Sequence, residues 1–342
     1  MLQGSGAVTR VMQSQGQMTP VFGAFTEAVF SDSTPGLTNQ LNLNGYQGND
    51  ADFYTNGDWS CPNQTTVSGS IIARGSISIS NSCSVAVDAW AGSTVSMANS
   101  AFVAHDVMSS TAALTMSNQS HIGHNVKVGT SCSGCTASRV GGVVTTNSPQ
   151  PAPTHRPYPS INYVGAGPWT AAGYEVIATS CPAARTWLLD AANRGKKALL
   201  RITGGCTLTL SNDTVSRTND VAILTDGPIV TSSNTLFQSG DADFHDLLLI
   251  VQSGITCTTN QTGAPGTITM QSSTSFSTLH FFVYAPCQVS FANNNSGSHG
   301  QIYGNPVVLA SHVSYTYYPT VVPGAGDIVR FLVKVAFVRE IL

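Results

Sequence analysis

Residues 71–108, IIARGSISISNSCSVAVDAWAGSTVSMANSAFVAHDVM, place small apolar residues at intervals of six, with mostly Ser, Asn, Gly, Asp and His between them. Extended in both directions, the first series consists of Thr55, Cys61, Val67, Ala73, Ile79, Val85, Ala91, Met97 and Val103. A second series, four residues after each member of the first, consists of Trp59, Thr65, Ile71, Ile77, Cys83, Ala89, Val95, Ala101 and Val107. This is a hexapeptide pattern with two inward positions in each hexad, which is typical of a solenoid.

A longer period of three hexads is also present. Asn63, Asn81, Asn99 and Asn118 follow one another at 18, 18 and 19 residues, with a one-residue slip near Ser110. Asn tolerates left-handed turn geometry, so we expect these four residues to form an asparagine ladder on one corner, about 5 Å apart, one strand spacing. The pattern predicts a triangular parallel β-helix of 18-residue coils and leaves its handedness open. The alternative is a β-sandwich whose strands are evenly spaced.

The domain organisation follows from where the repeat begins and ends. We expect an N-terminal segment (1–24), a hexapeptide-like β-solenoid (25–140), a Pro-rich linker (141–162) and a second β-helix-like domain (163–342). The linker has five prolines within eleven residues, which favours an extended polyproline-type connector; a Pro-rich ligand for another domain is the alternative.

The second domain contains one short predicted helix, near 182–194, with Thr179 or Ser180 as its cap and Gly195 at its exit. Continuously apolar runs follow, such as VAILTDG (221–227), which indicate strands buried on both faces. Their irregular spacing predicts a looser second β-helix, with a sandwich as the alternative. We expect the last stretch, 327–342, to close this domain. The overall fold class is therefore all-β, with two tandem β-helix regions and one short helix.

Composition restricts the compartment and the partners. Only 9% of the 342 residues are charged and the net charge is −3 without a basic cluster, so nucleic acid is not expected as a partner. No apolar run is long enough for a membrane span. The even number of cysteines favours disulfides and an oxidising compartment. The first 20 residues carry no export signal, so we expect an anchor or leader that is not present in this chain.

We predict disulfides between sequential cysteines. The pairs are Cys61–Cys83, Cys132–Cys135, Cys181–Cys206 and Cys257–Cys287. Cys132 and Cys135 form a CxxC motif, but no second CxxC exists for zinc. A local disulfide is therefore the better interpretation of that motif.

Only two clusters of side chains in the sequence are candidates for chemistry. His121 and His124 could supply a general base, as in hexapeptide-repeat acyltransferases, but the register puts Ile122 inward and both histidines outward or in a turn. The segment GDADFHD contains the other cluster, which consists of Asp241, Asp243, His245 and Asp246. Its oxygen ligands could hold calcium, although the twelve-residue calcium-loop pattern is absent. We therefore expect no catalytic residues, no metal site and no cofactor.

Two segments, VSGSIIARGSISISNSCSVAVDAWAG (67–92) and NQSHIGHNVKVGTSCSGC (118–135), resemble bactofilin-like polymer-forming surface proteins. The order of further segments, WTAAGYEV, VAILTDG and FVYAPCQVSFANNNSGSHGQIYG, resembles exported actinobacterial β-helix proteins associated with type IV pilus assembly. The resemblance covers roughly residues 25–342.

The resemblance implies a non-enzymatic structural or adhesive protein at the cell surface, held by an anchor outside this chain. Pilus or cell-surface components would then be its partners. Glycans are the other expected partners, because the outward positions are Ser, Thr, Asn and Gly with few charges. A carbohydrate-active or glycan-binding β-helix protein is the first alternative, and an intracellular polymerising scaffold is the second.

Overall fold

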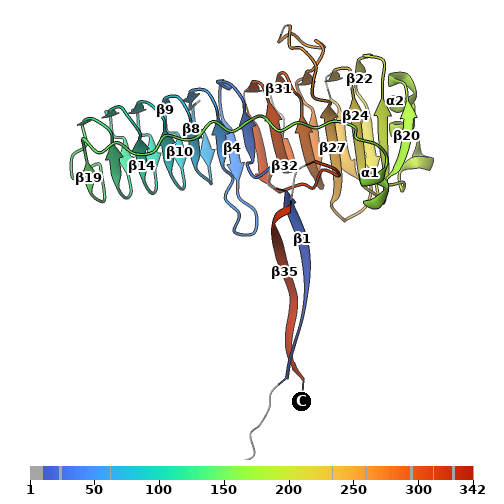
Figure 1. Ribbon diagram of the computed structural model, residues 1–342, viewed down its shortest axis with the longest axis horizontal. Helices are drawn as coiled ribbons and strands as arrows, with labels where there is room; N and C mark the ends of the chain where they lie inside the picture. Colours follow the sequence, from blue (N-terminus) through green and yellow to red (C-terminus); the bar gives the residue numbers. More distant parts are fainter. Residues whose placement is uncertain are drawn as a thin grey trace, which may run out of the picture.

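In a computed structural model, the chain forms one parallel β-solenoid of about 13 coils, with two α-helices and a projecting two-stranded ribbon (Figure 1). The structure describes residues 11–22, 25–61, 63–232, 234–258, 260–292, 296–310, 312–325 and 328–341. Of residues 11–22, 296–298 and 328–341 it describes the backbone only. The predicted fold class, all-β and parallel, is confirmed.

The first region contains the predicted hexads, and each coil up to β16 contributes three short strands. Its strands are β2 (Val29–Ser31), β3 (Gly36–Leu37), β4 (Leu41–Asn44), β5 (Phe53–Thr55), β6 (Trp59–Ser60), β7 (Thr66–Val67), β8 (Ile71–Ala73), β9 (Ile77–Ile79), β10 (Ser84–Val85), β11 (Ala89–Ala91), β12 (Val95–Met97), β13 (Phe102–Val103), β14 (Val107–Ser109), β15 (Leu114–Met116), β16 (His121–Ile122), β17 (Val126–Val128), β18 (Cys132–Ser133) and β19 (Val144–Thr145). Every member of both sequence series is buried. The slip is accommodated at Ser110, a buried corner residue whose hydroxyl donates to the carbonyl oxygen of Ala91 at 3.0 Å.

The second region has larger and less regular coils. Its strands are β20 (Glu175–Thr179), β21 (Ala198–Ile202), β22 (Leu208–Leu210), β23 (Thr214–Arg217), β24 (Val221–Thr225), β25 (Ile229–Thr231), β26 (Leu236–Ser239), β27 (His245–Val251), β28 (Ile268–Met270), β29 (Ser275–Ser277), β30 (Leu279–Tyr284), β31 (Val289–Phe291), β32 (Ser296–Gly304), β33 (Val307–Leu309) and β34 (Val313–Tyr317). All five residues of β24 are buried, so the prediction of strands covered on both faces is correct. Inward side chains join the solenoid core, while outward ones such as Leu248 and Phe282 form a second hydrophobic cluster outside it.

The two regions are stacked in an order that the sequence did not predict. The first coil of the first region lies on the last coil of the second: β2 pairs with β32, β3 with β33 and β4 with β34, all in parallel. Gly36 of β3 allows this close approach, because a Cβ there would lie 3.2 Å from Val308 Cγ2. We call this contact the joint. It turns two regions into one continuous solenoid.

Residues 146–166, which contain the Pro-rich segment, return along the length of the solenoid as a strap (Figure 1). The predicted linker boundary at 141 is too early, since β19 still pairs with β17 in the last coil. In the first region the indole of Trp90 donates to the carbonyl oxygen of Pro151 at 3.0 Å. In the second, the hydroxyl of Tyr158 donates to the carbonyl oxygen of Ala285 at 2.7 Å. The strap therefore contacts coils on both sides of the joint.

The two ends of the described chain form an antiparallel ribbon. β1 (Val11–Phe22) pairs with β35 (Ile328–Ile341), and the ribbon projects from near the middle of the solenoid (Figure 1). The expectation that the last stretch closes the second domain is therefore wrong, because β35 pairs only with β1 among the described strands. Residues 1–10 of the expected N-terminal segment lie outside the described residues.

Helices cover the end of the solenoid at β20. α2 (Cys181–Leu189) buries Cys181, Ala184 and Leu188 in the solenoid core. It ends before the predicted exit at Gly195, because Asp190 adopts an extended conformation and its carboxylate accepts the N–H of Ala192 to begin a separate 3-10 turn, η1 (Ala191–Asn193). A second short helix, α1 (Gly167–Ala171), was not predicted; it buries Trp169 in the outer hydrophobic cluster.

Candidate functional site

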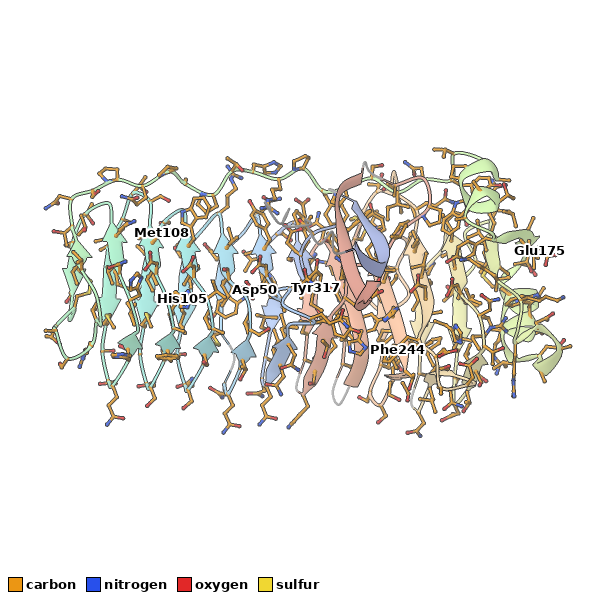
Figure 2. All side chains as sticks on the ribbon, turned by 90° about the horizontal axis from the view of Figure 1, so that it is seen from below. Asp50, His105, Met108, Glu175, Phe244 and Tyr317 are labelled. Atoms are coloured by element: carbon orange, nitrogen blue, oxygen red, sulfur yellow. A yellow bond between two sulfur atoms is a disulfide. The ribbon has the colours of Figure 1, made fainter. Side chains whose placement is uncertain are left out.

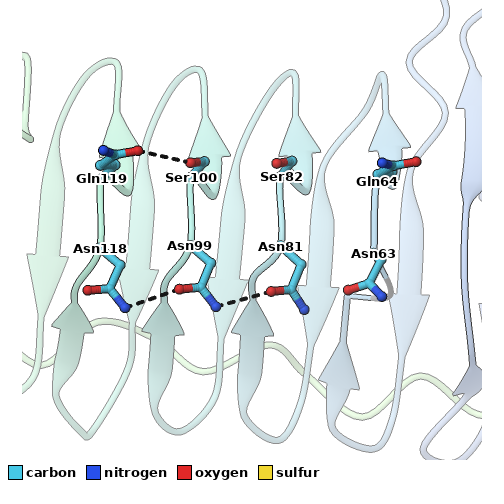
Figure 3. Close-up of a pocket in the computed structure, with 8 residues that line it drawn as sticks. All are labelled: Asn63, Gln64, Asn81, Ser82, Asn99, Ser100, Asn118 and Gln119. Atoms are coloured by element: carbon cyan, nitrogen blue, oxygen red, sulfur yellow. Dashed lines mark hydrogen bonds between the residues drawn. The ribbon is translucent and has the colours of Figure 1, made fainter.

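The asparagine ladder occupies one corner of the first region (Figure 3). Its members follow β6, β9, β12 and β15, whose strands stack in register. The side-chain amide of Asn99 donates to Asn81 Oδ1 at 3.1 Å, and that of Asn118 donates to Asn99 Oδ1 at 3.1 Å. Asn63 donates instead to Asn39 Oδ1 at 3.3 Å, which adds an earlier coil that the 18-residue spacing did not reveal.

The residue after each ladder asparagine forms a second row on the same corner. These residues are Gln64, Ser82, Ser100 and Gln119. All four have left-handed backbone, with φ of 53°, 61°, 61° and 62°. The two rows flank a shallow, open groove of 720 Å³, which we call the corner groove (Figure 3). All eight lining residues are exposed and uncharged.

The eight cysteines are joined in sequential pairs. The Cα–Cα distances are 6.3 Å for Cys61–Cys83, 5.7 Å for Cys132–Cys135, 6.1 Å for Cys181–Cys206 and 5.6 Å for Cys257–Cys287. The first links neighbouring coils and the third ties the start of α2 to the solenoid. No free cysteine occurs among the described residues.

His121 and His124 do not act on a common site. His121 lies on the outer face of β16, where its ring stacks on Phe102 at a centroid distance of 5.9 Å. His124 follows the strand, is 64% exposed, and places Nδ1 2.7 Å from Asp106 Oδ1. Burial by itself would raise the pKa of Asp106, but the backbone N–H of Asn125 and the His124 ring outweigh it and lower that pKa. The arrangement is a hydrogen-bonded His–Asp contact between neighbouring coils.

The acidic segment before β27 also separates into pairs. Asp241 Oδ1 lies 2.8 Å from His245 Nε2 and accepts the hydroxyl of Ser239. The Ser239 hydrogen bond is the main cause of the lowered pKa of Asp241. Asp246 instead faces the next coil, with Oδ1 3.2 Å from His280 Nδ1. Among the described residues, no group of three His, Cys, Asp or Glu side chains could hold a metal ion.

Sequence reasoning missed an aromatic cluster on the outer face of the second region. Asp246, His280 and His299 occupy one row across β27, β30 and β32. The His280 ring lies between Phe244 (centroids 4.9 Å apart) and Tyr318 (3.5 Å apart). Phe244 is 42% exposed and lies on the face from which the ribbon projects (Figure 2). These segments are far apart in the sequence and come together only because the strands pair in register. No local sequence motif therefore predicts the cluster.

A cavity of 450 Å³ lies beneath the strap, where Pro157 and Tyr158 cross the first coil. Glu27 lines it, is almost fully buried, and pairs with Arg156 of the strap. The hydroxyl of Tyr303 donates to the same carboxylate at 3.3 Å. Because these partners satisfy the buried charge, the contact fastens the strap to the joint.

No protein family and no curated protein matches this chain. Among solved structures it is similar to the crystal structure of the competence-associated pilin ComZ from Thermus thermophilus, with 11% identity and a TM-score of 0.31. The match covers 96% of this chain and 78% of that chain. A similarity of this size does not indicate what the present chain binds or assembles with. In the part of the chain that the structure describes, no helix has the length and apolarity to cross a membrane.

Proposed function

We propose that this chain is a non-enzymatic structural or adhesive protein of the cell surface, associated with pili, that displays a stiff solenoid on a narrow support. One observation carries the proposal: the joint makes a single solenoid, and both ends of the described chain leave it together as the β1–β35 ribbon. The ribbon is the natural point of attachment, and the solenoid is what it presents.

Stiffness follows from three features of the molecule. Each coil pairs with its neighbours along the solenoid faces, and one hydrophobic core runs through both regions. The strap binds coils on both sides of the joint, so it opposes their separation. Bending the solenoid would break several of these contacts at once, which suits a part held away from its support.

The extracellular location and the pilus association rest on different grounds. The disulfides suit an oxidising compartment outside the cytoplasm. The pilus association rests on the resemblance of the segments named in the sequence analysis. An anchor outside this chain completes the proposal.

The location is tested by inserting an epitope after Thr262, in the exposed loop before β28, in the complete protein made by its native host. We expect antibody to label intact cells and isolated pili in electron micrographs. Labelling that appears only after permeabilisation, together with free thiols in protein extracted with a thiol-trapping reagent, would overturn the proposal in favour of an intracellular scaffold.

The absence of catalysis is tested with a variant carrying His121→Ala, His124→Ala, Asp243→Ala and His245→Ala. We expect polysaccharide hydrolysis and acyl transfer to stay at background in both proteins, and surface attachment to stay unchanged. A measurable activity in the parent protein that the folded variant lacks would replace the structural role with an enzymatic one.

A further inference from the structure

We propose that the corner groove binds an extended, uncharged, β-1,4-linked glycan lying parallel to the solenoid axis. This inference rests on the proposed adhesive role only for the place where the protein would encounter the glycan, which is the cell surface. The binding itself is a property of the isolated chain.

The groove has a bounded shape. Its outer row carries short side chains, Ser82 and Ser100, on the two middle coils and long ones, Gln64 and Gln119, on the flanking coils. The Oε1 atom of Gln64 accepts the side-chain amide of Gln40 at 2.6 Å, and Gln119 Oε1 accepts the Ser100 hydroxyl at 3.4 Å. The outer row of the groove therefore has its shortest side chains on the two middle coils and longer amide side chains on the two flanking coils (Figure 3).

The ladder retains hydrogen-bonding capacity toward the groove. A primary amide has two N–H donors and two acceptor lone pairs. Asn99 uses one donor toward Asn81 and accepts one hydrogen bond from Asn118. One donor and one acceptor site per amide remain for a ligand, and hydroxyl groups match both because they donate and accept.

The absence of charge selects among polymers. None of the eight lining side chains is ionisable. Nucleic acids and polyuronates need cations to neutralise them, and this groove offers none. A neutral glycan loses no ion solvation on entering and finds amides and hydroxyls along its length.

The repeat distance selects the linkage. Adjacent parallel strands lie about 4.8 Å apart, and the four lining coils stack in register at β6, β9, β12 and β15. An extended β-1,4-linked chain advances by slightly more than this distance per sugar and turns each ring over relative to the one before. Alternate rings therefore present the same edge to amides that lie two coils apart. An α-1,4-linked chain coils and loses this register after one or two rings. The groove therefore accommodates about three sugars across four coils.

The groove is also organised before binding. The left-handed residues are held by backbone hydrogen bonds between coils, such as Ser82 N to Asn99 O at 2.9 Å and Ser100 N to Asn118 O at 2.9 Å. Little conformational entropy is lost when the ligand enters such a site. Since no aromatic ring lines the groove, affinity for a short oligosaccharide is expected to be weak and to rise with chain length.

The test uses two hexasaccharides of glucose that differ only in linkage, cellohexaose (β-1,4) and maltohexaose (α-1,4). Binding is followed by two-dimensional NMR of the side-chain amides of the chain. The filling variant is Ser82→Gln with Ser100→Gln. Its fold should be intact, because Gln64 and Gln119 already occupy equivalent positions with the same left-handed backbone. The matched control is Ser273→Gln, a serine with φ of 63° in the second region, outside the groove.

We expect cellohexaose, but not maltohexaose, to shift the amide signals of Asn81 and Asn99. We expect its affinity to fall at least tenfold in the filling variant and to be unchanged in the control. No binding of cellohexaose, equal binding of both hexasaccharides, or unchanged binding in the filling variant would each overturn the inference. None of these results bears on the epitope experiment, so failure of the groove and failure of the surface role are distinguishable.

Discussion

Replacing Ile302 with alanine tests whether the joint unites the two regions. Ile302 is fully buried on β32, between Val283 of β30 and Val29 of β2. The change removes three carbons, about 2.4 kcal/mol at 0.8 kcal/mol per buried methylene. The cavity left in a continuous core adds to this, so the expected loss of unfolding free energy is about 3–4 kcal/mol.

The assay is hydrogen exchange followed by mass spectrometry, alongside thermal unfolding. If the joint is continuous, amide protection falls on both sides of it, in β5 and β8 of the first region as well as in β27 and β30 of the second. The surface control is Val143→Ala, at a residue that is 67% exposed, where we expect a change within about 0.5 kcal/mol. Loss of protection confined to β27 and β30 would refute the continuous solenoid and restore two independent domains.

Three further predictions follow from single contacts. Replacing both Cys181 and Cys206 with alanine should lower the free energy of unfolding by about 3 kcal/mol, since the disulfide closes a loop of moderate length and holds α2 on the core. The midpoint of the unfolding transition measures this loss. An unchanged midpoint would contradict a stabilising role for the disulfide. Asn99→Val should lower the free energy of unfolding by about 1–2 kcal/mol, because a φ of 50° disfavours a β-branched residue. Asn99→Gly should keep the backbone conformation and lose only the side-chain amide contacts. Equal stability of the Val and Gly variants would be inconsistent with this reasoning. Burial raises the pKa of the Tyr284 hydroxyl from 10.0 to about 12, so the stability that this group contributes is complete below pH 10 and is lost as pH rises through 12. The free energy of unfolding should therefore fall less between pH 10 and 12 in Tyr284→Phe than in the parent protein. An identical fall in both proteins would exclude this tyrosine as a cause.

The repeat made the first region predictable from sequence. A solenoid core recurs at a fixed interval because each coil packs on the next, so the inward residues, the ladder corner and the slip at Ser110 all appear as local spacing. The disulfide pairing could be predicted from sequence for a related reason, since sequential cysteines on neighbouring coils lie close together. Strands buried on both faces also left a local signature, as VAILTDG shows.

Contacts between distant segments were decided only by the tertiary structure. The joint pairs β2 with β32. The periodicity of the sequence does not predict which two end coils will stack on each other, because the strand edges at the ends of both regions are able to pair. The strap, the ribbon and the aromatic cluster around His280 depend on the same placement. The corner groove was predicted only in part. The sequence spacing located its asparagines, but the second row of serines and glutamines that completes the groove is formed only when the coils stack. Local spacing records what neighbours in the chain must do, whereas pairing of remote edges is selected by the free energy of the whole fold.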